Sequence, residues 1–97
     1  MNDRSIETEL VVRHEHGLHA RPAAAFVRKA ASFQADIRIQ NLHRGAEFHD
    51  AKSLTDLLLA RVDCNHRIRL VASGADAQEA VEALTALLNE AARKRGG

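Results

Sequence analysis

A histidine and an arginine stand two residues apart in the segment Gly17-Leu18-His19-Ala20-Arg21-Pro22-Ala23. The alanine-rich stretch that follows predicts a helix beginning here, and a helix start offers free backbone N–H groups and partial positive charge to an anion. That field favours the neutral imidazole of His19, which can attack phosphorus. Arg21 can neutralise the phosphoryl oxygens with a fork of donors. The segment indicates a phosphoryl-acceptor site, with Ala20 and Pro22 at the helix start beside the phosphate.

Two other interpretations of this segment stay open on spacing alone. His19 could be an ordinary helix cap and Arg21 a surface charge. The spacing favours this interpretation and the phosphoryl-acceptor site equally. A metal site built from His14, His16 and His19 is disfavoured, because no nearby cysteine and no carboxylate spacing completes a ligand set. We therefore expect no metal and no cofactor.

Hydropathy periods predict the elements that must position this segment. Apolar residues alternate with polar ones from Ile6 to Val12, as in a half-buried strand, and recur at helical spacing from Ala20 to Ala31. Pro22 suits a first helical turn, where no N–H is needed. The remaining periods predict strands over 36–40, 47–50 and 67–70, a short helix over 54–58, and a long helix whose apolar stripe covers 80–91.

Turn and capping signals separate these elements. Residues 41–45 suggest a hairpin loop, residues 62–65 a turn, and Gly74-Ala75 a break after the last strand. Ser53 with Asp56, and Asp76 with Glu79, have the form of capping boxes. Gly96 can end the last helix, and the basic tail 93–97 is expected to fray.

The element order β-α-β-β-α-β-α gives every strand one apolar face and every helix one apolar stripe. Packing one sheet against all helices on one side satisfies both, which predicts a single α+β domain over 1–97, ordered from about residue 5 to 92. Leu, Ile, Val and Ala must build the core, since aromatic residues make up only 3% of the chain.

Composition excludes several classes of protein. The net charge of +1 and the absence of Tyr and Trp argue against nucleic-acid binding by charge or stacking. No apolar run approaches the roughly 20 residues of a membrane span, and no signal peptide follows Met1. Cys64 is the only cysteine, so no internal disulfide can form, which is typical of a reducing cytoplasm; we expect an unreactive turn or core thiol.

Three motifs in this order resemble the HPr family, the histidine-containing phosphocarriers of the bacterial phosphotransferase system. They are the segment 17–23, Lys52-Ser53-Leu54, and a run with Gly74, Asp76, Ala80 and Val81. The resemblance covers about residues 6–89. It implies an open-faced β-sandwich with a four-stranded antiparallel sheet and three helices on one side. It also implies a cytoplasmic carrier, not an enzyme, that receives a phosphoryl group on His19 from enzyme I and passes it to an enzyme IIA.

Some residues depart from the family pattern. Arg61 and Asn65 stand where relatives often have glycine; Asn tolerates left-handed backbone, whereas Arg61 suggests a differently shaped helix end. Asp56 replaces a basic or neutral residue and could alter partner docking. His16 and the long loop 41–50 resemble the HPr-like modules of fructose-specific multiphosphoryl proteins.

The second helix has two candidate roles. Ser53 is expected to cap it, and the family resemblance adds possible regulatory phosphorylation by a serine kinase. The docking patch is expected to draw on Ala20, Ala24, Arg28, Leu54, Thr55, Leu58 and Leu59, with Leu57 in the core. An alternative function is a regulatory module that acts through Ser53 or by docking transcriptional regulators. We expect a monomer in either case.

Overall fold

The computed structural model describes residues 5–13, 17, 18, 20–45 and 47–96, without the side chains of residues 20 and 90–96. The predictions for His14, His16 and His19 lie outside the described residues. The elements follow the predicted order and are β1 (Ser5–Val11), α1 (Ala20–Ala31), β2 (Asp36–Asn41), β3 (Phe48–Asp50), α2 (Leu54–Leu59), β4 (Arg67–Ser73) and α3 (Ala77–Gly96).

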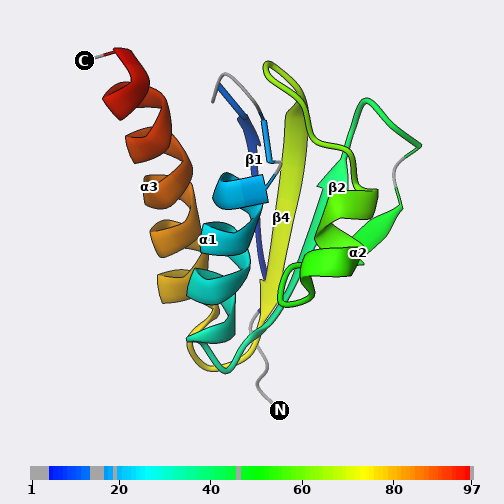
Figure 1. Cartoon of the computed structure of the whole chain (residues 1–97). Coiled ribbons are helices and arrows are strands. Elements are labelled where there is room, and N and C mark those ends of the chain that lie inside the picture. Colours follow the sequence, from blue (N-terminus) through cyan, green and yellow to red (C-terminus); the bar gives the residue numbers. More distant parts are fainter. Residues whose placement is uncertain (1–4, 14–16, 19, 46, 97) are drawn as a thin grey trace.

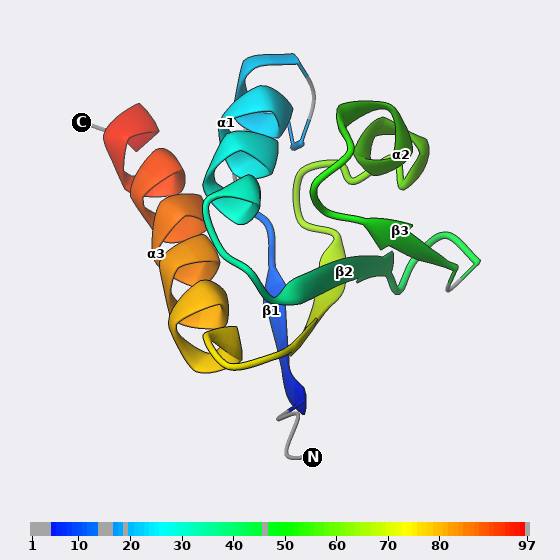
Figure 2. The same cartoon turned by 90° about the horizontal axis from the view of Figure 1, so that it is seen from below.

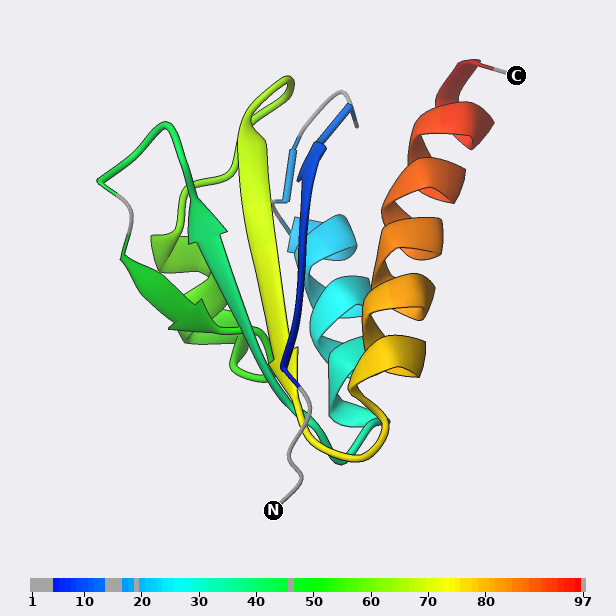
Figure 3. The same ribbon diagram turned by 180° about the vertical axis from the view of Figure 1, so that it is seen from behind.

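The four strands form one antiparallel sheet in the order β1-β4-β2-β3. All three helices cover the same face, so the molecule has two layers (Figures 1 and 2). The opposite face of the sheet carries no helix (Figure 3). The predicted open-faced α+β architecture is confirmed, and no helix in the described part of the chain is long and apolar enough to cross a membrane.

Strand alternation accounts for the core. Ile37 and Ile39 of β2 lie beside Ala72 and Leu70 of β4, and all four side chains are buried under the helices. The intervening residues of β2 point to the open face, as the period of two requires. The helices complete the core with their apolar stripes, and its members include Leu18, Ala23, Phe26, Ala30, Leu57, Ala80 and Leu84.

The element bounds differ from prediction at some ends. β4 continues to Ser73, three residues past its predicted end, because its pairing with β1 and β2 runs to that residue. α3 ends at Gly96, the glycine predicted to end it, and so includes residues 93–96, which were expected to fray. β3 is short and begins at Phe48.

The second predicted capping box is wrong. The carboxylate of Asp76 does not cap α3; its two oxygens accept hydrogen bonds from the backbone N–H groups of Gln34 and Ala35, at 2.9 and 2.8 Å. Asp76 therefore ties the loop before α3 to the loop between α1 and β2. Gly74 lies in the same contact, where a Cβ would come within 3.1 Å of the Ala35 Cα. These charge-assisted hydrogen bonds hold the pKa of Asp76 below its usual value.

Candidate phosphoryl-acceptor site

The chain enters α1 across the loop that connects α2 to β4. Gly17 is buried with φ +63°, and a Cβ there would collide with the Val62 carbonyl oxygen and lie 2.6 Å from the Asp63 Cα. The N–H of Leu18 donates a hydrogen bond to the Val62 carbonyl oxygen at 2.9 Å, and its side chain is buried in the core. Only glycine satisfies both the left-handed backbone and the close approach at position 17. The loop 60–66 therefore fixes the chain just before position 19.

The first turn of α1 presents a basic group to solvent. α1 begins at Ala20 and has no acidic residue in its first turn. Arg21 is exposed and forms no ion pair with another described residue. Pro22 is half-buried, and Ala23 is fully buried beneath it. The described first turn of α1 thus has an exposed guanidinium and no carboxylate, which suits the binding of an anion.

The loop 60–66 contains two left-handed residues. Arg61 has φ +52° and Asn65 has φ +71°, at the two positions where the family resemblance leads us to expect glycine. Both residues thus adopt the left-handed backbone that glycine favours. The prediction for Asn65 is confirmed, and the expected change in the shape of the helix end at Arg61 is wrong. Arg61 ends α2 in this conformation, which an arginine adopts at an energetic cost.

Ser53 is the N-cap of α2, as predicted. Its hydroxyl oxygen accepts a hydrogen bond from the Asp56 N–H at 3.2 Å. The reciprocal half of the capping box is absent, because the Ser53 N–H donates to the Asp50 carbonyl oxygen. The Asp56 carboxylate instead accepts the Asp50 N–H at 2.8 Å and lies 2.8 Å from His49 Nδ1. These partners, the Asp50 N–H above all, lower the pKa of Asp56 and tie β3 to α2.

All of the large exposed apolar residues in the described part of the chain except Phe48 lie on α2. Leu54 and Leu58 are 41% and 39% exposed, and Thr55 and Leu59 are exposed as well, whereas Leu57 is fully buried, as expected. α2 contacts α1, and the two helices run in opposite directions (Figure 1). Leu58 therefore lies nearer than Leu54 to the end at which α1 begins.

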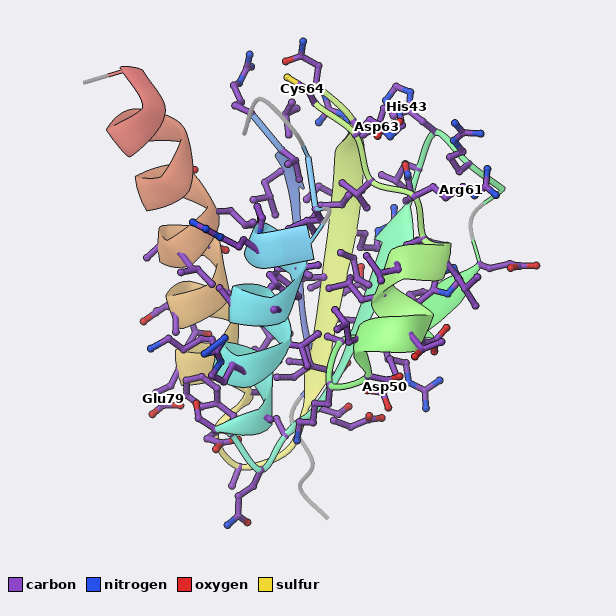
Figure 4. All side chains as sticks on the ribbon, viewed as in Figure 1. His43, Asp50, Arg61, Asp63, Cys64 and Glu79 are labelled. Atoms are coloured by element: carbon purple, nitrogen blue, oxygen red, sulfur yellow. The ribbon has the colours of Figure 1, made fainter. Side chains whose placement is uncertain are left out.

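The structure does not bring every predicted site residue together. Ser53 lies toward the other end of α1, since Lys52 Nζ donates a hydrogen bond to the carbonyl oxygen of Phe33, just past that helix, at 2.7 Å. Figure 4 shows Asp50 at this lower end and Asp63 and Arg61 at the upper end. Ala24 is half-buried, and Arg28 lies with Leu87 in a groove between α1 and α3, away from α2.

A metal-binding cluster is also lacking in the described part of the chain, where no three His, Cys, Asp or Glu side chains could hold one ion. Cys64 is exposed in the turn before β4. It therefore occupies the turn, one of the two predicted places for this thiol, and not the core.

Comparison with known proteins decides the family. The family model described as "PTS HPr component phosphorylation site" matches residues 6–90. The chain belongs to the HPr family. The HPr of Vibrio cholerae is 38% identical over 84 residues, which cover 87% of this chain and 95% of that protein. The family model is named for the phosphorylation site of the HPr component of the phosphotransferase system, and this chain has the fold and the sequence signature of that family.

A solved structure and a longer relative show further similarities to this HPr domain. An HPr structure from Thermoanaerobacter tengcongensis superimposes with a TM-score of 0.83 at 31% identity, covering 90% of this chain and 94% of that one. The multiphosphoryl transfer protein of Haemophilus influenzae is 47% identical over 73 residues, 75% of this chain but 15% of that protein. The chain spans between 15% and 22% of the length of such multiphosphoryl relatives.

Sequence reasoning missed several residues that shape the site. Asn41, His49 and His66 make side-chain contacts that hold the loops. The partner of Asn41 is distant in sequence, whereas His49 and His66 contact residues seven and three positions away, across turns whose shape the sequence pattern did not predict. A polar residue at the end of an otherwise buried strand, as Asn41 is, was the available hint, since buried amides need partners.

Proposed function

We propose that this HPr domain is a phosphoryl carrier that accepts a phosphoryl group on His19 and hands it on. The observation that carries the proposal is the anchored entry into α1, where Gly17 and Leu18 are fixed on Val62 directly before His19 in the chain. The family match over residues 6–90 supports the same role. The carrier is stoichiometric and has no turnover of its own.

In the proposed reaction, a ring nitrogen of His19 forms a bond to phosphorus as the bond from phosphorus to the donor breaks. Arg21 and the free N–H groups at the start of α1 offset the charge of the phosphoryl oxygens. The side chain of Arg21 is exposed, so it stabilises the phosphorylated state only moderately. A carrier needs this balance, because the next acceptor must be able to remove the group. Ala20 and Pro22 shape the helix start beside it.

Docking of the donor and acceptor is assigned to the exposed side of α2 and the start of α1. Leu54, Thr55 and Leu58 supply exposed surface on α2, which contacts α1, the helix that carries Arg21 and Ala24. An apolar patch with a basic rim suits transient docking on acidic partner surfaces. Enzyme I and an enzyme IIA are the proposed partners, in the cytoplasm. Arg28, which the sequence also suggested for docking, lies in the groove between α1 and α3 and is left out of the proposed surface.

The test is phosphorylation by phosphoenolpyruvate and a general enzyme I, scored as acid-labile phosphate on the protein. The expected result is one labile phosphate on the wild type and none on a folded His19→Ala variant. An Arg21→Ala variant should be labelled more slowly while its unfolding midpoint stays unchanged, because the side chain is exposed. Unlabelled wild type, shown to be folded, would overturn the carrier function, and labelling of His19→Ala would move the acceptor elsewhere.

A further inference from the structure

A buried asparagine holds the loop 60–66, which contacts the segment 17–23 that is proposed to carry the phosphoryl acceptor. Asn41, the last residue of β2, is only 2% exposed. Its Nδ2 donates to the carbonyl oxygen of Ala60 at 2.9 Å and to that of Arg61 at 3.1 Å, and its Oδ1 accepts the His43 N–H at 2.9 Å. The side chain thus satisfies the carbonyl groups at the end of α2, where the helix offers no further N–H partner.

His66 makes hydrogen-bond contacts with the second half of the same loop. Nδ1 of His66 accepts a hydrogen bond from the Asp63 N–H at 3.1 Å and lies 3.1 Å from Asn41 Nδ2. The backbone N–H of Asp63 can only donate, so Nδ1 is the accepting nitrogen of the ring and the hydrogen of the neutral ring lies on Nε2. The ring of His43 stacks on that of His66, with centroids 4.9 Å apart and an interplanar angle of 8°. The orientation of His66 is therefore fixed on several sides.

These contacts hold the loop backbone on both sides of Val62, the residue that the segment 17–23 contacts. Asn41 holds residues 60 and 61, and His66 holds Asp63. Val62 lies between them, and its carbonyl oxygen accepts the Leu18 N–H. In Figure 4, His43, Arg61 and Asp63 lie together at the end of the molecule where α1 begins.

We propose that Asn41 and His66 are positioning residues for phosphoryl transfer: they hold the loop 60–66 so that Gly17 and Leu18, and with them the acceptor position, are set for reaction. This inference rests on the proposed carrier function. Neither residue touches the phosphoryl group. Their contribution is to keep one loop conformation populated, since misplacement of a reacting atom by a small distance lowers the rate strongly.

The first test is an Asn41→Leu variant, which keeps the side-chain size and removes the donors. Hydrogen exchange of the Leu18 amide should become about tenfold faster or more, because an unsatisfied carbonyl pair favours local opening of the loop. With enzyme I as donor, the maximal rate of phosphoryl uptake should fall by about the same factor or more. The half-saturating concentration should stay within about twofold, since the exposed docking residues of α2 are unchanged.

A matched control separates positioning from loss of global stability. Val81→Ala removes core volume in α3, far from the loop, and should change neither the Leu18 exchange nor the maximal rate while the protein stays folded. If Asn41→Leu does not fold, His66→Phe serves instead, because it keeps a ring against His43 and removes the Nδ1 acceptor. It should show the same pair of changes.

Two results would overturn the proposal. One is unchanged Leu18 exchange in a folded Asn41→Leu or His66→Phe variant. The other is faster exchange with an unaltered maximal rate, which would leave these residues a structural role only. If the wild type accepts no phosphate, the carrier function fails, and this inference fails with it, whatever the exchange shows. Labelled wild type together with unchanged exchange overturns the positioning role alone.

Discussion

The N–H of Leu18 donates a hydrogen bond to the carbonyl oxygen of Val62, at 2.9 Å. The two residues are far apart in sequence, yet this bond and the packing of Gly17 on Val62 determine where the chain enters α1. The helix start that is proposed to carry the reactive histidine thus depends on the loop between α2 and β4. Substitutions in the loop 60–66 should therefore alter the conformation at the start of α1, and substitutions at the start of α1 should alter the loop.

Gly17→Ala should be strongly destabilising. A Cβ at position 17 would collide with the Val62 carbonyl oxygen, and φ +63° disfavours any L side chain, so we expect a loss of at least about 2 kcal/mol in the free energy of unfolding. Urea denaturation measures it. Gly45→Ala is the matched control, since Gly45 also has positive φ, at +87°, but a Cβ there meets nothing within 4 Å. If the two variants lost equal free energy of unfolding, the backbone at Val62 would move away from the added Cβ at little cost, which would contradict this prediction.

Arg61→Gly should stabilise the domain. Arg61 ends α2 with φ +52°, which costs a non-glycine residue about 1–2 kcal/mol, while the added freedom of glycine in the unfolded chain returns part of the gain. We expect a net increase of about 0.5–1 kcal/mol, seen as a higher urea midpoint with an unchanged slope. Asn65→Gly is the comparison, and its effect should be near zero because asparagine tolerates φ +71°. A lower midpoint for Arg61→Gly would show that the arginine side chain makes a compensating contact.

Asp76→Asn should flatten the acid dependence of stability. Backbone N–H groups of Gln34 and Ala35 hold the pKa of Asp76 below its ordinary 3.8 in the folded protein. A lowered folded pKa means that the ionised carboxylate stabilises the fold fully above about pH 5, and that this contribution is lost as the pH falls through 3.8 and below. The variant should be less stable than wild type at neutral pH, and the two should converge on acidification.

Thermal unfolding between neutral and acidic pH measures this convergence. Asp36→Asn is the control, because Asp36 is exposed and its described partner is Arg38 in a surface ion pair, which contributes little. Its curve should run parallel to that of wild type. A constant difference between Asp76→Asn and wild type at all pH values would show that charge at position 76 is not the source of the stability.

Local patterns were sufficient to predict one sheet with all helices on one side, whereas the antiparallel four-stranded arrangement was expected only from the resemblance to HPr. Two patterns each identify a buried face: the alternation around Ile37 and Ile39, and the helical stripe through Phe26 and Ala30. Such faces are buried together when the helices pack on one side of a single sheet. The N-cap role of Ser53 was equally local, because the cap and its partner Asp56 are three residues apart. Interactions within one turn of the chain can be predicted from sequence.

The contacts that position the site could not be predicted in this way. Asp76 has the spacing of a helix cap, but the fold brings the N–H groups of Gln34 and Ala35 to its carboxylate, and these two donors compete successfully with the local one. Asn41 likewise bonds Ala60, which approaches only after β2 and α2 have packed. The left-handed backbone at Arg61 contradicts local preference and is imposed by the loop.

Leu54→Glu should slow phosphoryl transfer without unfolding the domain. Leu54 is 41% exposed on α2, so an acidic side chain there costs little stability, about 0.5 kcal/mol or less, while it adds charge and removes apolar surface where partners are proposed to dock. The half-saturating concentration of enzyme I should rise. Leu58→Glu should have the larger effect, because Leu58 lies nearer the start of α1.

Phe48→Glu is the matched control for this surface. Phe48 is 48% exposed, but it pairs with Gln40 in the sheet and so lies on the open face, away from the helices. The same change from apolar to acidic should leave transfer kinetics unaltered there. Leu57→Ala gives the opposite contrast, since emptying a fully buried site should cost about 2–5 kcal/mol and act through unfolding. If Leu54→Glu and Phe48→Glu slowed transfer equally, the effect would come from net charge, and α2 would lose its assigned role in docking.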